Sequence, residues 1–201
     1  MNESLIDEHR YINVDHFDWY ESTYSDWYDK LSAMGFTPGK FGFSGFCSQG
    51  DGASFTGMVY AKDMRQFMIA NDLLEEFPAV AYFADYEGEG KVSITAKRNH
   101  SRYEHEYSVD IEVNAHDDIF YIVDDVEDST DLRDVLFCTM ADKLRLEEQD
   151  AFQSRVTEIL RDLMRQFYRD LEAEYEYLTS DECVLEFLKA NDMLEPEDEV
   201  A

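Results

Sequence analysis

Residues 40–60 read KFGFSGFCSQGDGASFTGMVY and decide the fold class of this chain. Aromatic and small residues alternate on both sides of a polar, glycine-rich segment, SQGDGA at residues 48–53. Alternation with a period of two is typical of strands, and a glycine-rich polar segment between two such runs is typical of a turn. The sequence therefore predicts a β-hairpin with strands at about 40–47 and 54–60.

A second hairpin is predicted at about 91–115. The run KVSITAKRN (residues 91–99) supplies one strand, and YEHEYSVDIEVNA (residues 103–115) supplies the other. Successive side chains of a strand point to opposite faces, so the second run separates its apolar residues from its acidic ones. One face is predicted to carry Tyr103, His105, Tyr107, Val109, Ile111 and Val113, and the other Glu104, Glu106, Asp110 and Glu112.

Helical periodicity surrounds the hairpins. The strongest stripe of apolar residues at spacings of three and four lies at 150–177. The run Thr179-Ser180-Asp181-Glu182 fits a capping box, which predicts the start of a short last helix. Further helical segments are predicted at about 15–34, with Asp15 as its cap, at about 62–76 and 78–86, and throughout 131–191.

These elements predict one α+β domain over residues 1–201. We expect an antiparallel sheet from two hairpins covered by helices, with a long C-terminal amphipathic helix and a short final helix. The acidic tail at 195–201 is expected to be frayed. The chain is 44% hydrophobic and 14% aromatic, which is enough for a sizeable core and argues against a disordered chain.

The charge balance limits the classes of partner. The chain has 17 basic and 46 acidic side chains, a net charge of −29. Nucleic acids and anionic lipids are themselves polyanions, so direct binding to either is disfavoured. A partner with a basic surface is favoured instead.

The remaining composition indicates the compartment. The three cysteines, Cys47, Cys138 and Cys183, are far apart and fit neither a disulfide framework nor a zinc site. The first twenty residues do not resemble a signal peptide, and no apolar run approaches the length of a membrane span. We expect a protein of a reducing cytoplasm that does not bind membranes.

Three segments of the chain resemble a known family. They are SGFCSQGDGASFTG (residues 44–57), HEYSVDIEV (residues 105–113) and LMRQFYRDLEAEYEYLTSDECV (residues 163–184). In this order they resemble poorly characterised phage, prophage and bacterial proteins that share an SGFxSQGDGASFxG hairpin, some of which are labelled as antitoxins. The resemblance implies a phage or mobile-element origin, and it carries over no catalytic residue.

The SQGDGA turn allows three interpretations. In the structural one, Gly50 and Gly52 take positive φ while Ser48, Gln49 and Asp51 bond to the backbone. Alternatively Ser48, Gln49 and Asp51 contact a partner, or Asp51 marks a metal-dependent or enzymatic site, although no known loop pattern fits. Cys47 is expected to be a buried small residue rather than a nucleophile paired with His100 or His105.

The acidic residues of 103–134 form the main candidate site. Alternate strand residues lie about 6.8 Å apart, at about 3.4 Å per residue, which approaches the spacing of phosphates on one nucleic-acid strand. A basic cleft built for phosphates would bind such a face through Arg–carboxylate pairs. A merely solvated edge and a divalent-cation site are the alternatives for 117–134. The predicted face comprises Glu104, Glu106, Asp110, Glu112, Asp117, Asp118, Asp124, Asp125, Glu127 and Asp128.

The function expected from these patterns is non-enzymatic inhibition. A phage or mobile-element protein of this kind would bind a host nucleic-acid-binding protein, such as a defence nuclease, a nucleoprotein complex or a toxin, by imitating DNA or RNA in the host cytoplasm. We expect no cofactor and no metal, and the aromatic run at 17–28 is compatible with a homo-oligomer. A structural or assembly protein of a phage particle is the other alternative. The arginines Arg155, Arg161, Arg165 and Arg169 are expected to form ordinary i,i+4 pairs with neighbouring acids.

Overall fold

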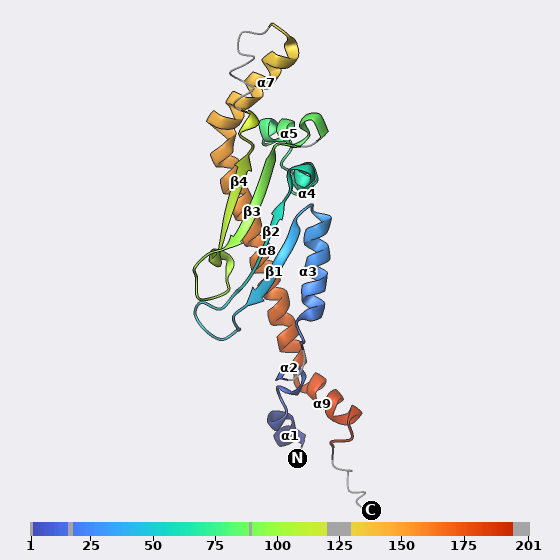
Figure 1. Cartoon of the computed structure of the whole chain (residues 1–201). Helices are drawn as coiled ribbons and strands as arrows, with labels where there is room; N and C mark the ends of the chain where they lie inside the picture. The colour runs from blue at the N-terminus through green and yellow to red at the C-terminus, as the bar shows by residue number, and fades with distance from the viewer. Residues whose placement is uncertain (1, 16–17, 89, 120–129, 195–201) are drawn as a thin grey trace, which may run out of the picture. The chain divides into compact units, whose positions relative to one another are not determined.

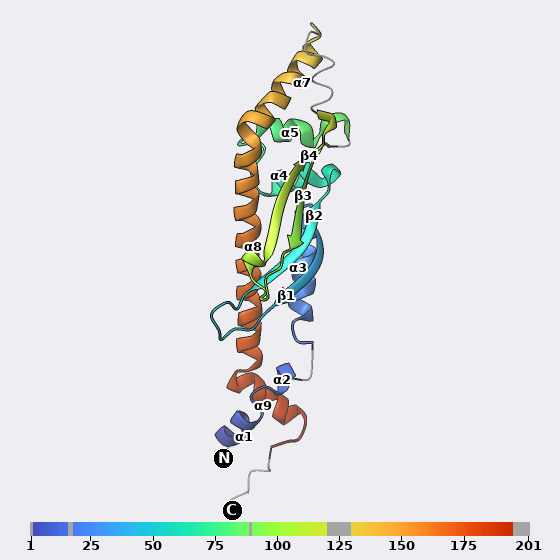
Figure 2. The ribbon, with the colours of Figure 1, turned by 60° about the vertical axis from the view of Figure 1, so that its left-hand side comes forward.

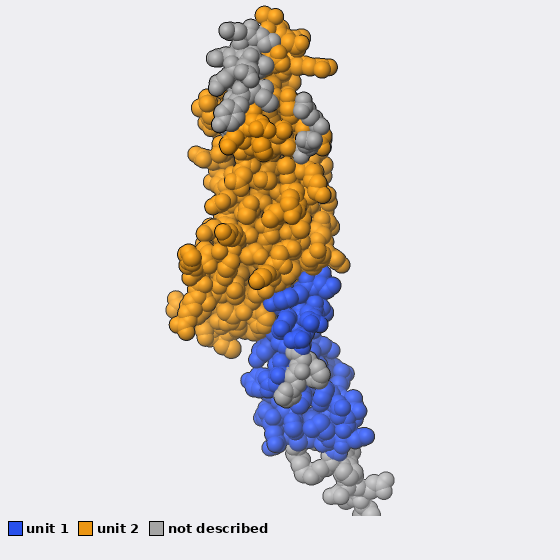
Figure 3. Space-filling view, viewed as in Figure 1, with its two compact units in different colours: residues 1–26, 169–201 blue, residues 27–168 orange. Residues whose placement is uncertain are grey.

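The computed structural model describes residues 2–15, 18–88, 90–119 and 130–194. The chain forms two compact units, residues 1–26 with 169–201, and residues 27–168 (Figure 3). Two helices run through the division between these ranges. The expectation of a single domain therefore stays a prediction.

The larger unit is built on one antiparallel sheet of four strands. These are β1 (Thr37–Phe43), β2 (Ala53–Val59), β3 (Val92–Arg98) and β4 (Val109–Ala115), in the spatial order β1-β2-β3-β4 (Figure 1). The two predicted hairpins are joined by pairing between β2 and β3. The predicted α+β class with an antiparallel sheet is confirmed.

Strand β4 is shorter than the sequence predicts. It begins at Val109 rather than at Tyr103, and the chain before it forms the 3-10 turn η3 (Glu106–Ser108). His105 fixes this turn, because its Nδ1 accepts the backbone N–H of Tyr107 at 3.0 Å. A polar side chain that bonds to nearby backbone competes with the sheet ladder. The predicted separation into an apolar and an acidic face therefore holds only from Val109 onward.

One face of the sheet is covered by a helix, and the other is open to solvent. Helix α8 (Gln149–Leu178) runs along the covered face, where Phe167 packs against Phe41 of β1 (Figure 2). On the open face Asp110 and Glu112 are exposed. This arrangement is common for antiparallel sheets. The covered face of β3 and β4 buries Val92, Ile94, Ala96, Val109 and Ile111.

Shorter helices complete this unit, and two of them start or stop away from their predicted ends. The helix predicted at 15–34 is α3 (Glu21–Ala33), and Asp15 ends the preceding helix instead of capping this one. The helix predicted at 62–76 stops at Ala70, because Asp72 has φ 57°, which a continuing helix excludes. The remaining elements are η1 (Ala61–Asp63), α4 (Met64–Ala70), α5 (Pro78–Ala84), η2 (Tyr86–Gly88), α7 (Leu132–Lys143) and the π-helical turn η4 (Leu144–Glu148), which leads into α8.

The smaller unit is helical. It contains α1 (Asn2–Glu8), α2 (Ile12–Asp15), the end of α8 and α9 (Asp181–Ala190). Ser180 caps α9 by accepting the N–H of Cys183 at 3.3 Å, which confirms the predicted start of the last helix. Its small core consists of Ile6, Val184 and Leu188, with Leu5, Leu185 and Leu194 packed against them.

None of the helices in the described ranges combines the length and the apolar composition needed to cross a bilayer. The tail at 195–201, predicted to be frayed, lies outside the described residues.

Candidate functional site

Two loops lie at the same end of the sheet, because all three neighbouring strand pairs, including β2-β3, are antiparallel. We call residues 44–52 and 99–108 the loop pair. They are in contact: Ser44 Oγ donates to the carbonyl of Glu104 at 3.0 Å. A Cβ added at Gly52 would lie 2.7 Å from Cβ of His105. The close approach of the two loops explains why a glycine stands at position 52.

The SQGDGA turn is held by its own aspartate. Asp51 Oδ2 accepts the backbone N–H groups of Cys47 at 2.8 Å and Ser48 at 2.6 Å. The anion-binding position of the turn is therefore filled by Asp51 itself, as the structural interpretation predicts. Gly50 has φ +104°, but the positive φ predicted for Gly52 is wrong. Glycine is required at position 52 because a side chain there would clash with His105, and not because the backbone has a positive φ.

The turn leaves a small polar tip exposed. Ser48, Gln49 and Cys47 are all exposed, so the prediction that Cys47 is buried is wrong. The tip extends past the ends of β1 and β2, where no core reaches it. Beneath it, Phe46 stacks between Phe43 and Tyr168, with ring centroids 5.5 Å apart in each pair. A rigid base thus carries exposed Ser48 and Gln49, which remain candidates for partner contact.

The Glu104 carboxylate is partly buried and bonds to other residues of the fold. It accepts a hydrogen bond from Ser54 Oγ at 2.5 Å and pairs with Arg98 at 3.1 Å. Arg98 also donates to the carbonyls of Ser101, Tyr103 and Ser108, so it holds the whole second loop together. The prediction that Glu104 lies on an acidic strand face is therefore wrong.

Glu106 is also removed from the predicted face. It lies in η3, its side chain is 21% exposed, and it pairs with Arg165 of α8 at 3.6 Å. Asp110 and Glu112 do lie on the open face of β4, as predicted. Their register partners on β3 are Lys97 and Thr95, so a cation stands beside Asp110. This part of the surface is a mixed patch and not a run of carboxylates.

The other predicted carboxylates follow β4. Asp117 and Asp118 are exposed, and Asp118 contacts His116 Nδ1 at 3.2 Å and Lys91 Nζ at 3.9 Å. The structure therefore does not bring the six described members of the predicted face into one continuous ridge. The remaining four, Asp124, Asp125, Glu127 and Asp128, lie outside the described residues.

The acidic excess is concentrated elsewhere, in the smaller unit. Residues 1–26 and 169–201 carry 19 acidic and 3 basic side chains, a net charge of −16. Residues 27–168 are more than twice as long and carry 27 acidic and 14 basic side chains, a net charge of −13. The uneven distribution of charge is visible in the sequence. The division into compact units shows that the residues with the larger excess, far apart in the sequence, belong to one unit.

Helix α8 changes character along its length. Residues 149–168 contain three acids and three arginines, and Arg155 pairs with Glu158 at 2.8 Å. Residues 169–178 contain four acids and one arginine. The carboxylates that take part in no ion pair among the described residues include Glu172, Glu174 and Glu176 of α8 and Glu182 and Glu186 of α9. We call these five the acidic cluster.

Two side chains beside the acidic cluster have a raised pKa. The pKa of Tyr177 lies above its ordinary value, because negative charge on Cys183 and Glu186 opposes phenolate formation. The pKa of Cys183 is raised by burial first, and then by Glu186, Glu174 and Glu182. Each anion that forms here is opposed by carboxylates already present. Glu186 contributes to both shifts.

The family of the chain is found by comparison with known proteins. A family model described as "Domain of unknown function (DUF8835)" matches residues 19–181. The chain belongs to the DUF8835 family. No curated protein and no solved structure matches it. The DUF8835 match includes the whole sheet, the loop pair and all of α8, and it begins after α1 and α2 and ends at the first residue of α9.

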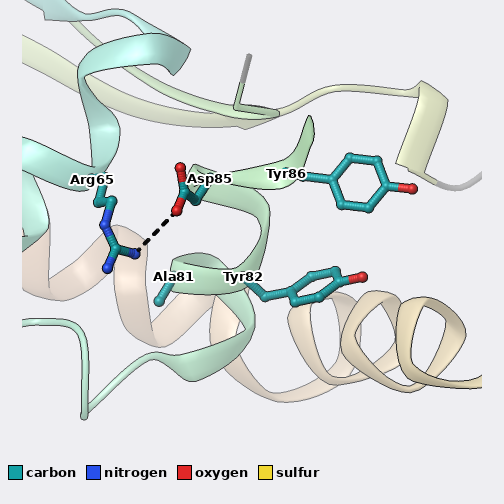
Figure 4. A pocket seen from close by; sticks show the side chains of 5 residues that line it. All are labelled: Arg65, Ala81, Tyr82, Asp85 and Tyr86. Atoms are coloured by element: carbon teal, nitrogen blue, oxygen red, sulfur yellow. Dashed lines mark ion pairs between the residues drawn. The ribbon is translucent and has the colours of Figure 1, made fainter. Parts of the chain in front are cut away.

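The DUF8835 segment also contains a depression that sequence reasoning missed. It has a volume of about 480 Å³ and is lined by Arg65, Ala81, Tyr82, Asp85 and Tyr86 (Figure 4). Arg65 of α4 approaches Asp85, at the end of α5, to 3.6 Å, and both side chains are largely exposed. An exposed, loose ion pair of this kind contributes little and supplies no reactive group. Because the lining residues come from α4, α5 and η2, no local motif signals the depression.

Two polar side chains of the loop pair already bond to its backbone. Asp51 already accepts two backbone N–H groups, and His105 Nδ1 accepts that of Tyr107. In the described part of this DUF8835 protein, no three His, Cys, Asp or Glu side chains gather as metal ligands would.

Proposed function

We propose that this protein is a non-enzymatic inhibitor that binds a nucleic-acid-binding protein through the acidic cluster. The observation that carries the proposal is the change in α8. A segment with balanced charge continues into residues 169–178, whose Glu172, Glu174 and Glu176 take part in no ion pair among the described residues. A basic cleft that normally holds phosphates would attract and bind this segment.

The spacing of the carboxylates in the acidic cluster destabilises the helices that carry them, and this favours a functional reason for the cluster. Glu172 and Glu176 lie four residues apart on one helix, and so do Glu182 and Glu186. Like charges at this spacing destabilise a helix by about 0.2–0.5 kcal/mol per pair. Solubility alone does not require such pairs, because intervening basic residues would leave a chain of this composition strongly charged.

The spacing of the carboxylates suits a phosphate-binding partner. Residues four apart on a helix are separated by about 6 Å along its axis, at 1.5 Å per residue. This is of the same order as the distance between successive phosphates on one strand. The imitation of nucleic acid that the sequence suggested for residues 103–115 is thus better supported on helices α8 and α9.

The loop pair supplies the kind of surface that gives specificity. Tyr103 is 49% exposed and lies near Gly50 of the turn, and Tyr107 is 57% exposed. Tyrosines dominate the energetics of many protein interfaces, and Ser and Gly accompany them in adaptable binding loops. We propose that long-range attraction comes from the acidic cluster and that short-range selection comes from the loop pair.

The setting of this function is part of the proposal. The resemblance of residues 44–57, 105–113 and 163–184 to phage and prophage proteins supports a mobile-element inhibitor that acts in the cytoplasm of a bacterial host. Its target would be a defence nuclease, a nucleoprotein complex or a toxin. The chain itself would not bind nucleic acid, because its net charge is −29.

The test compares two variants with the same net charge. In the first, Glu172, Glu176, Glu182 and Glu186 are replaced by Gln. In the control, four exposed acids of the larger unit are neutralised, by Asp29→Asn, Glu75→Gln, Glu147→Gln and Asp150→Asn. Tagged wild-type protein is used to capture partners from bacterial lysate at low salt, and the bound proteins are then eluted with duplex DNA or RNA.

We expect wild-type protein and the control to retain a nucleic-acid-binding protein that nucleic acid displaces, and the first variant to lose it. Retention should fall steeply with added salt, because exposed charges are screened within about 8 Å at physiological ionic strength. Equal retention by both variants, or captured proteins that nucleic acid does not displace, would rule out the proposal.

A further inference from the structure

Arg161 is the exception among the arginines of α8. Arg155 pairs with Glu158, and Arg165 pairs with Asp162 and Glu106, so both have carboxylate partners. The two pairs within the helix are spaced i,i+3 and not i,i+4 as predicted. Arg161 takes part in no ion pair with any described residue. The prediction that it pairs with a neighbouring acid is therefore wrong. In a chain of net charge −29, a guanidinium without a carboxylate partner requires a physical explanation.

The surroundings of Arg161 fix its guanidinium on an aromatic ring. Its Cζ lies 4.7 Å from the ring centroid of Tyr107, within the range of a cation–π contact. Its Nε is buried and has no hydrogen-bond partner, the one such side-chain atom among the described residues. Buried polar atoms are almost always bonded, so an orphaned N–H indicates that a water or a ligand supplies the acceptor.

A depression opens beside this group. It has a volume of about 400 Å³, enough for a small ligand group. Two of its polar side chains are engaged with the helix backbone: Ser154 Oγ donates to the carbonyl of Asp150, and Thr157 Oγ1 donates to that of Gln153. Its lining comprises Tyr107, Gln153, Ser154, Thr157, Glu158, Arg161 and Arg165.

The charges around the depression leave Arg161 as the unmatched group. Glu158 is held by Arg155, and the positive charge of Arg165 is met by Asp162 and Glu106. Gln153 is also occupied, because its amide bonds to the backbone of Ile111 and Val113. An acceptor for the Arg161 guanidinium must therefore come from outside the described chain.

The geometry points to a binding site for a single carboxylate, with Arg161 as the residue that binds it. A guanidinium stacked on a ring presents its N–H donors at its edge, and a planar carboxylate matches that edge with two parallel hydrogen bonds. A singly charged carboxylate is favoured over a doubly charged phosphate, because a protein of net charge −29 repels the phosphate more strongly. This inference does not depend on the proposed function.

The full-length protein tests it without any substitution. In protein labelled with ¹⁵N, the Nε–H resonance of Arg161 is followed while sodium acetate, sodium phosphate or sodium chloride is added at matched ionic strength. We expect a saturable downfield shift with acetate in the millimolar range, a weaker response to phosphate, and none to chloride. The Nε–H resonances of Arg155 and Arg165 serve as internal controls and should move little.

Variants then assign the site. Arg161→Lys keeps the positive charge but removes the planar donors, and it should weaken acetate binding at least tenfold, as seen in the amide shifts of Thr157 and Tyr107. Arg155→Lys is the matched control and should leave the acetate response unchanged. Equal shifts with acetate and chloride, a stronger response to phosphate than to acetate, or an acetate response that survives Arg161→Lys would each overturn the assignment.

Discussion

The carboxylate of Glu148 accepts the backbone N–H of Ala79 at 2.9 Å, across sixty-nine residues of chain. The same carboxylate accepts the N–H of Val80 at 3.0 Å and pairs with Lys143 at 3.2 Å. Helix α5 begins at Pro78 and has no side-chain cap of its own. Glu148, in the π-helical turn before α8, therefore caps α5 from another part of the fold, and its side chain is only 7% exposed.

Replacing Glu148 should destabilise the larger unit. Glu148→Ala leaves two buried N–H groups without acceptors, and we expect the free energy of unfolding to fall by about 2–4 kcal/mol. Urea denaturation measures this, with Glu147→Ala as the control, because Glu147 is an exposed neighbour. A loss no larger than that of the control would show that the cap is not needed.

Alanine substitutions at three glycines should destabilise the protein in the order of the steric clash that each added Cβ creates. A Cβ at Gly57 would lie 2.3 Å from the carbonyl oxygen of Thr37, and one at Gly52 would lie 2.7 Å from Cβ of His105. A Cβ at Gly50 would meet nothing closer than 3.9 Å, although its φ of +104° is strained for alanine. Thermal unfolding should show the largest loss for Gly57→Ala and the smallest for Gly50→Ala. The reverse order would contradict the packing described for these three positions.

Gln153 should protect the edge of the sheet. Its Oε1 accepts the N–H of Val113 and its Nε2 donates to the carbonyl of Ile111, both at 2.6 Å. The amide thus occupies part of the outer ladder of β4, which would otherwise be open to pairing with another chain. We expect Gln153→Leu to speed hydrogen exchange at Val113 and to increase aggregation. Ser154→Ala, the control, should leave exchange at Val113 unchanged.

The acidic cluster should control the ionisation of Cys183. Burial and nearby carboxylates raise the pKa of this thiol, so less thiolate is present at a given pH and alkylation is slower. Glu186→Gln should lower the pKa and speed alkylation by iodoacetamide, measured against pH with Cys47 and Cys138 replaced by Ser. An unchanged pH profile would exclude a contribution from Glu186.

The same raised pKa determines a pH dependence of stability. Below the pKa of an unperturbed thiol, about 8.5, both states hold the proton and the free energy of unfolding is unaffected by this group. Above it, the unfolded state loses the proton first, so stability should fall as pH rises through the raised pKa of Cys183. Cys183→Ser should reduce that slope in urea titrations.

Neutralising the acidic cluster should stabilise the protein while it weakens partner binding. Removing like charges four residues apart with Glu176→Gln and Glu186→Gln should raise the free energy of unfolding by about 0.2–0.5 kcal/mol for each pair. Added salt should stabilise wild-type protein more than this variant. A loss of stability on neutralisation would show that the carboxylates have structural partners and would weaken the functional argument.

The sequence by itself determined the class of the fold and the total charge. Alternation at 40–60 and 91–99 predicts strands because the period of a strand is two, and the stripe at 150–177 predicts α8 because helical positions three and four apart share a face. The capping box at 179–182 predicts the start of the last helix from local chemistry, although the observed cap is Ser180 and not Thr179, the first residue of the box. These features depend only on residues close together in the chain.

The tertiary structure alone decided which carboxylates remain available. Glu104 and Glu106 continue the alternation of β4 in the sequence. In the structure, however, Glu104 bonds to Ser54 and Arg98, and Glu106 pairs with Arg165. Arg161, conversely, looks paired in the sequence and is not. The physical reason is the same in each case: an ionic group pairs with the group nearest in space, and for these groups that partner lies far along the chain or, for Arg161, on no described residue.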